Sequence, residues 1–175
     1  MENCGPVSPM GVKVFTELKS NLSRHSDLVT LRETGAQLSI KPIGPNTFPI
    51  LVVDDGREVM ISALRWHTHE DSAEQTVACV MWLLTSFYRI VETERRGIFV
   101  MGRLEKFEPP GQWTVESETG PLFRSFGWKH HQVRIAYQQN VLPCPPAFLK
   151  QFAPGALDES GIPIGSQLGN HALDQ

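Results

Sequence analysis

Two histidines separated by a single residue have the types and spacing that best suit chemistry in this sequence. His67 and His69 lie in the segment Trp66-His67-Thr68-His69-Glu70. Side chains two positions apart on a β-strand point to the same side, so the two imidazoles can bind one divalent metal ion. A third ligand, if the site has one, is expected to be His131, the one distant histidine on a predicted inward strand face. The alternative is that His67 and His69 end the strand at a solvated rim.

Glu74 adds a carboxylate to this pattern, four intervening residues after His69. The spacing resembles the first metal motif of the cupin family, which is His-x-His followed by Glu. In cupins that glutamate lies on a continuing β-hairpin, whereas Glu74 is predicted to lie in the first turn of a helix. The glycines that frame the family's motif are also missing. We therefore keep Glu74 as a further candidate ligand and do not transfer the cupin roles.

The acidic residues around His69 offer a different chemistry, an acid–base cluster with Glu70, Asp71 and Glu74. Neighbouring carboxylates shift each other's pKa, as general acids and bases require. Acidic residues are equally expected at a helix N-terminus, because they interact favourably with the helix dipole. No nucleophile can be named beside the cluster, and the sequence has no G-x-S-x-G motif. The sequence therefore defines no catalytic residues, and these observations favour a protein that is not an enzyme.

Residues 123–131 (FRSFGWKHH) form a second candidate site, because they interleave aromatic and cationic side chains without an acid. Such a composition suits base stacking and phosphate binding. A loop that packs Phe and Trp beneath a sheet has the same composition, and the net charge of −3 favours this alternative. The candidate anion- or nucleic-acid-binding residues are Arg124, Trp128, Lys129, His130 and Arg134.

The element that must position the histidines is a central helix, predicted over residues 71–86. Asp71 and Glu74 have the spacing of a capping box at its start. Apolar residues then recur at intervals of three and four, which places them on one helix face. These residues are Val77, Val80, Met81, Leu84 and Tyr88.

A β-hairpin precedes that helix. Asp55-Gly56 is typical of a two-residue turn, which would place Val52 opposite Val59. A single strand is then predicted from residue 57 to the helix. Its alternation puts Arg65, His67 and His69 on the same face as the apolar residues of the hairpin. That apolar face consists of Phe48, Ile50, Val52, Val59, Ile61 and Ala63.

The remaining pattern predicts an α+β fold with a mainly antiparallel sheet of about six to eight strands and two helices. The first helix is expected from Ser8-Pro9 to about Ser23. Further strands are predicted at residues 27–33, 37–41, 88–94, 98–107, 112–118 and 130–138. We expect residues 1–140 to form one domain. Residues 141–175, rich in proline and glycine, are expected to form a partly irregular tail.

Composition indicates an ordinary globular protein, with 41% hydrophobic and 20% charged residues in a chain of 175. No secretory signal is visible at the N-terminus, and the longest apolar run is too short for a membrane span. The three cysteines have no close pair and no metal-type spacing. We therefore expect a cytoplasmic protein without membrane partners.

The run from Trp66 to Trp113 resembles a pattern of small bacterial α+β proteins of uncharacterised activity. It combines Trp-His-x-His, an acidic helix start, a helix ending near Phe87-Tyr88, and a basic glycine turn at Arg95-Arg96-Gly97. The resemblance implies a bacterial α+β domain and does not indicate any activity. From the residues themselves we expect a non-enzymatic binding or interaction module, of accessory, chaperone-like or immunity type.

Such a module would bind a protein partner or associate with itself, and no cofactor is expected. Two alternatives stay open. One is a metal-dependent enzyme or metal binder that uses His67 and His69. The other is an anion or nucleic-acid binder that uses residues 123–134, although the composition does not favour a nucleic-acid partner.

Overall fold

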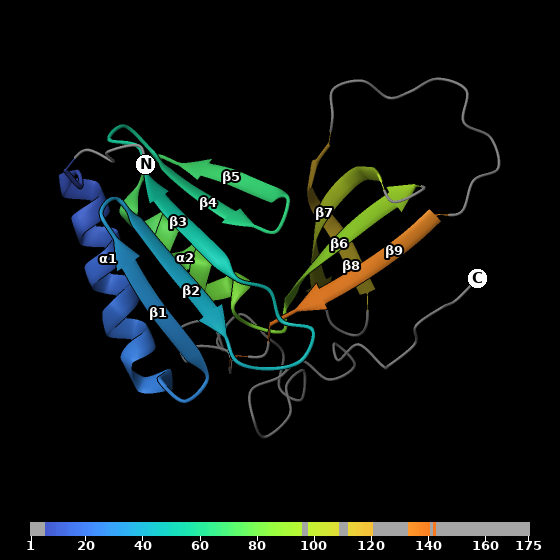
Figure 1. The fold of residues 1–175 in the computed structure, drawn as a ribbon, viewed down its shortest axis with the longest axis horizontal. Coiled ribbons are helices and arrows are strands. Elements are labelled where there is room, and N and C mark those ends of the chain that lie inside the picture. The colour runs from blue at the N-terminus through green and yellow to red at the C-terminus, as the bar shows by residue number, and fades with distance from the viewer. Residues whose placement is uncertain (1–5, 96–97, 109–111, 121–132, 141, 143–175) are drawn as a thin grey trace.

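The computed structural model describes residues 6–95, 98–108, 112–120, 133–140 and 142. Over these residues the chain forms two α-helices, one short 3-10 helix and nine strands in two antiparallel sheets (Figure 1). The predicted α+β class is confirmed. The helices are α1 (Pro9–Leu22) and α2 (Ala73–Leu83), with the 3-10 helix at Ser23–His25, and the strands are β1 (Val29–Thr34), β2 (Gln37–Pro42), β3 (Ile50–Asp54), β4 (Val59–Ala63), β5 (Trp66–Glu70), β6 (Tyr88–Arg95), β7 (Ile98–Glu108), β8 (Gln112–Thr119) and β9 (Val133–Gln139).

The first sheet is a meander in which β1 to β5 pair in chain order. Both helices cover one of its faces and pack against each other, and the main hydrophobic core lies between helices and sheet. Fully burying one aliphatic side chain contributes roughly 1.5–3 kcal/mol. The sheet's share of this core is Val29, Leu38, Ile40, Ile50, Val52, Val59, Ile61 and Ala63, and α1 adds Val14, Phe15, Leu18 and Leu22.

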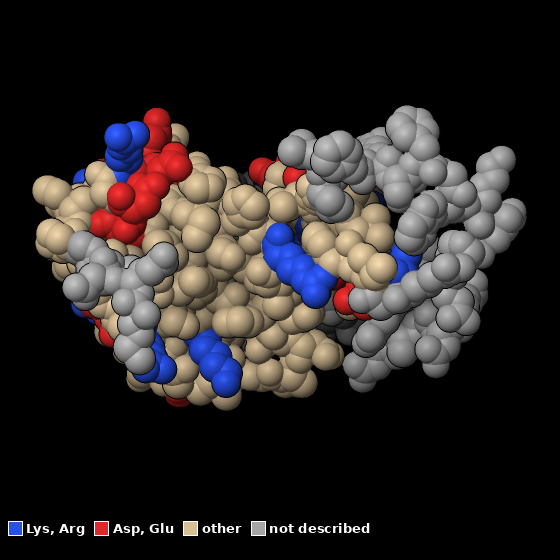
Figure 2. Space-filling view, turned by 45° about the horizontal axis from the view of Figure 1, so that its top comes forward, with Lys and Arg blue, Asp and Glu red and all other residues tan. Residues whose placement is uncertain are grey.

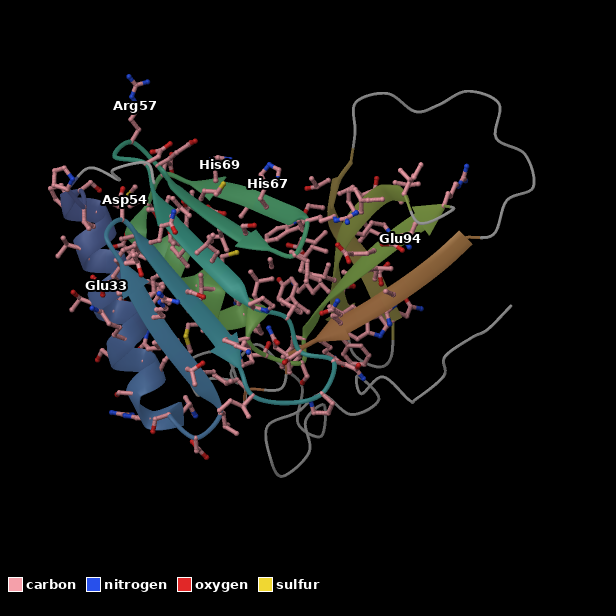
Figure 3. All side chains as sticks on the ribbon, in the orientation of Figure 1. Glu33, Asp54, Arg57, His67, His69 and Glu94 are labelled. Atoms are coloured by element: carbon pink, nitrogen blue, oxygen red, sulfur yellow. The ribbon has the colours of Figure 1, made fainter. Side chains whose placement is uncertain are left out.

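α1 begins where the sequence predicts. The Ser8 hydroxyl accepts the Gly11 N–H at 3.1 Å, and Pro9 occupies the first helical position. Asp54, at the end of β3, accepts the Ser8 N–H at 2.5 Å and the Ser8 hydroxyl at 2.9 Å (Figure 3). Gly11 permits this approach, because a Cβ at that position would lie 2.2 Å from the Asp54 Oδ2. The carboxylate therefore fixes the positive end of the helix to the sheet.

α2 is shorter than the predicted helix over residues 71–86 and has a different cap. The Ser72 hydroxyl accepts the Gln75 N–H at 3.1 Å, so the predicted capping box of Asp71 and Glu74 is wrong. Serine is as good an N-cap as aspartate. Glu74 instead forms an ion pair with Lys13 of α1, which holds the pKa of the Glu74 carboxyl below its usual range.

β3 and β4 form the predicted hairpin, but their register is displaced by two residues. Val52 faces Ile61 rather than Val59. The loop spans residues 55–58, because the Asp55 carboxylate accepts the backbone N–H groups of residues 57 and 58, each at 2.9 Å. A shift by two residues leaves every side chain on its face. The predicted buried face is therefore confirmed.

The prediction of one strand from residue 57 to His69 is wrong. The chain turns after β4 at Leu64, which has a φ of 55°, and β5 returns antiparallel to β4. Trp66 pairs with Ala63 and takes its place on the buried face. Because side chains alternate along a strand, His67 and His69 lie on the opposite, outer face.

The second sheet has the strand order β8-β7-β6-β9. β6, β7 and β8 keep the predicted positions to within about a residue, and β9 begins at Val133, since residues 130–132 lie outside the described chain. Tyr88, Ile90 and Leu104 extend the main core. Elsewhere in this sheet Arg89 pairs with Glu105, with 2.6 Å between Nη2 and Oε2.

The predicted tail, residues 141–175, lies outside the described residues except for Leu142, whose N–H donates to the Leu84 carbonyl at 2.9 Å. Within the described part of the chain, no helix is both long enough and apolar enough to cross a membrane.

One buried side chain joins the two sheets. The Asn140 Oδ1 accepts the Phe48 N–H at 3.1 Å, and its Nδ2 donates to the Leu83 carbonyl at 3.0 Å. Phe48 leads into β3, Leu83 ends α2, and Asn140 follows β9. A further bond runs from the Gln139 Nε2 to the Ser86 carbonyl at 2.6 Å. The last residue of β9 and the residue after it are thus hydrogen-bonded to α2, to the segment that follows α2 and to the lead-in to β3.

We expect Asn140→Ala to lower the free energy of unfolding by about 2–4 kcal/mol, because it leaves a buried N–H and a buried carbonyl without partners. Urea unfolding followed by tryptophan fluorescence measures the change. Asn21→Ala, at an exposed position on α1, is the control and should change stability by less than about 0.5 kcal/mol. Equal stability of both variants would contradict the role of Asn140.

Candidate functional site

A pocket of about 400 Å³ lies where β5, α2 and the second sheet meet. Three segments far apart in sequence form its walls. Its lining residues are Trp66, Thr68 and Glu70 from β5, Gln75, Ala78, Cys79, Trp82 and Leu83 from α2, and Tyr88, Leu104, Glu116 and Ser117 from the second sheet.

β5 contributes through its alternation. Trp66, Thr68 and Glu70 share one face of the strand, while the intervening histidines share the other. The Trp66 Nε1–H donates to the Ser117 hydroxyl of β8 at 2.7 Å. This bond fixes the edge of the first sheet against the second and satisfies the buried indole.

The position of Glu116 results from a β-bulge. Leu104 pairs with Ser117, and the next residue of β7, Glu105, pairs with Val115. Glu116 is therefore the extra residue of β8. A bulge commonly redirects a side chain, and here Glu116 and Ser117 both reach the pocket although they are neighbours in the chain.

Aromatic rings form much of the inner wall. The Trp82 ring lies edge to face with the Tyr88 ring, with centroids 6.1 Å apart, and with the Phe87 ring at 5.4 Å. Trp66 and Tyr88 are buried, as are Leu83 and Leu104, whereas Glu70 is half-buried and Glu116 is exposed. The pocket thus has an apolar floor and two carboxylates nearer to solvent.

The two ionisable groups of the inner wall stay protonated at neutral pH. Burial raises the pKa of the Cys79 thiol from 9.0 to about 12, and the Glu70 and Glu116 carboxylates add to the shift. Burial also raises the pKa of the Tyr88 hydroxyl, again with a contribution from Glu116. The thiolate is the nucleophilic form of cysteine. Cys79 is therefore a polarisable wall residue at neutral pH rather than an activated nucleophile.

The predicted histidine pair lies outside this pocket. His67 and His69 project from the outer face of β5, both exposed, with ring centroids 5.8 Å apart (Figure 3). The His69 Nδ1 lies 2.6 Å from the Glu58 Oε1. Within the described ranges, no three side chains of His, Cys, Asp or Glu form a group that could hold a metal ion.

Glu74, the other predicted metal ligand that the structure describes, does not lie beside His67 and His69. Glu74 lies on α2, on the helical side of the first sheet, and is paired with Lys13. His131 lies outside the described residues, as do Arg124, Trp128, Lys129 and His130 of the basic stretch. Arg134 lies in β9, where its backbone is opposite Glu94 of β6 in the strand register. On the face of the molecule that Figure 2 shows, the described charged side chains form small separate groups with uncharged surface between them.

The sequence analysis missed the pocket itself. The sequence pattern could have indicated one wall of the pocket, because Trp66, Thr68 and Glu70 alternate with the histidines and include a large aromatic residue. No sequence pattern indicated Glu116, because simple alternation places it on the side of the strand opposite to Ser117. Comparisons with protein-family models, curated proteins and solved structures found no significant match.

The raised pKa of Cys79 predicts slow alkylation and alkaline sensitivity. With Cys4 and Cys144 changed to serine, iodoacetamide at pH 8 should react about a thousandfold more slowly with the folded chain than with the urea-unfolded chain, because three pKa units separate their thiolate fractions. Between pH 9 and 12 the unfolded state loses this proton and the folded state keeps it. Stability should therefore fall as pH rises through this window, and less so for Cys79→Ala. Alkylation rates within tenfold of each other would contradict the assignment.

Proposed function

We propose that this chain is a non-enzymatic binding module that holds a compact ligand in the pocket between β5, α2 and the second sheet. The observation that carries the proposal is the pocket itself. Its volume of about 400 Å³ lies at the lower end of the range of small-molecule sites. Its walls are apolar and aromatic, with a few fixed polar groups, as such sites usually are.

The chemistry of the lining supports binding more than catalysis. The Cys79 thiol and the Tyr88 hydroxyl stay protonated, and the His67 and His69 imidazoles lie on the other face of β5. A general acid or base needs a pKa near the working pH, and neither Cys79 nor Tyr88 has one. In an accessory, chaperone-like or immunity-type protein, the pocket would hold part of the partner.

A neutral apolar dye, N-phenyl-1-naphthylamine, tests whether the pocket binds. We expect its fluorescence to rise with the wild-type chain, and the emission of Trp66 and Trp82 to fall by energy transfer. Ala78→Trp places a large ring in the pocket and should weaken dye binding at least about tenfold, since the indole occupies part of the volume that the dye needs. Ala78→Leu should have a smaller effect in the same direction.

Val12→Trp is the matched control, because it adds the same ring at an exposed position of α1. Circular dichroism and thermal unfolding establish that each variant is folded. Equal dye affinity of folded Ala78→Trp and the wild type would exclude the pocket as the binding site.

A second candidate function is divalent-metal binding by His67 and His69, favoured by the geometry of the pair. The Glu58 carboxylate lies beside the His69 Nδ1, so Nε2 is the ring nitrogen that would bind a metal ion. We expect Ni²⁺ or Zn²⁺ binding by calorimetry, lost in His67→Ala/His69→Ala and weakened about 10–100-fold in Glu58→Gln. His25→Ala is the control. Unchanged affinity of the double variant would exclude this site.

A further inference from the structure

The charge of the pocket is unbalanced. Among the residues that the structure describes, its lining includes two carboxylates, Glu70 and Glu116, and no Lys, Arg or His. Within the described part of the chain, neither carboxylate has an ion-pair partner, whereas Glu58, Glu74 and Glu105 each have one. Carboxylates next to apolar walls are stabilised by a cation. A ligand that supplies a positive charge would therefore complete this site.

The two carboxylates act on the same part of the pocket. Both are close enough to Cys79 to raise the pKa of its thiol, and Glu116 acts on Tyr88 as well. Glu70 reaches this place from β5, and Glu116 reaches it only through the bulge of β8. Two strands of different sheets thus each place a carboxylate in the pocket lining, near Cys79.

The aromatic walls favour the same kind of ligand. A cation within about 6 Å of an indole or phenol ring is attracted by the negative face of the ring. Trp66, Trp82 and Tyr88 all line the pocket, and Tyr88 and Leu104 join the buried core at its floor. The floor of the pocket suits an apolar group. Glu70 is half-buried and Glu116 is exposed, so both lie nearer to solvent. An ammonium group beside these carboxylates would keep part of its hydration.

We propose that the ligand is a small organic amine, with its apolar body against Trp66, Tyr88 and Leu104 and its ammonium group between Glu70 and Glu116. This inference rests on the proposed function, because it names the ligand class of the same pocket. The cavity of about 400 Å³ suits a ring with a short alkylamine chain. Charge complementarity selects the amine over a neutral or anionic compound of the same shape.

Three compounds of one shape test the charge preference by calorimetry: 3-phenylpropylamine, 3-phenylpropan-1-ol and 3-phenylpropanoate. We expect the amine to bind about tenfold more tightly than the alcohol, and the carboxylate to bind more weakly than both. Glu70→Gln and Glu116→Gln should each reduce the preference for the amine, and the double variant should abolish it. The affinity for the alcohol should stay within about twofold in all three variants.

Glu118→Gln is the matched control, because it removes the same charge from β8 outside the pocket. Equal affinities of amine and alcohol, or an amine preference that survives the double variant, would overturn the inference while the neutral dye still reports a working pocket. Failure of the dye and of all three compounds would overturn the proposed function as well. Tighter binding of Nα-acetyl-lysine methylamide than of 3-phenylpropylamine would assign the pocket to a lysine of a partner chain and overturn the free amine.

Discussion

The Asn140 side-chain amide is the interaction on which the arrangement of the two sheets depends. It is fully buried, and it pairs one backbone N–H before β3 with one backbone carbonyl at the end of α2. Buried backbone groups in native proteins are almost always paired. The Asn140 amide pairs both groups at the point where the end of β9, the end of α2 and the lead-in to β3 meet. A separate bond, from the Trp66 Nε1–H to the Ser117 hydroxyl, joins β5 to the second sheet, and both of these residues line the pocket.

α2 is placed between two layers, and its composition follows from this. On one side of the helix, Val77 and Val80 pack in the core against the first sheet. On another side, Ala78, Cys79 and Trp82 line the pocket. A helix with apolar residues on more than one side is generally buried on more than one side. The Trp82 ring contacts both Phe87 and Tyr88. Through these contacts the hydrophobic core is continuous with the pocket wall.

Local patterns predicted the helices, most strands and the buried face of the β3–β4 hairpin, because each depends on neighbouring residues. The turn at Leu64 had no such signal, since a leucine with positive φ is uncommon and depends on tertiary structure. The hairpin register depended on the Asp55 side chain, which selects a four-residue loop over the two-residue turn that Asp-Gly favours. The Glu116 bulge depends on how β7 and β8 pair, and no single segment encodes that pairing. The pocket was unpredictable for this reason, although Trp66 and Glu70 were visible.

β5 shows how the two candidate sites are related. Its odd-numbered histidines face outward beside Glu58, and its even-numbered residues Trp66, Thr68 and Glu70 face the pocket. The turn at Leu64 decides this division, because it returns the chain with Trp66, and not His67, on the side of Ala63. A continuous strand would have placed the histidines on the same face as Ala63. The observed turn instead places Trp66, Thr68 and Glu70 in the pocket lining and leaves the histidines on the outer face of β5.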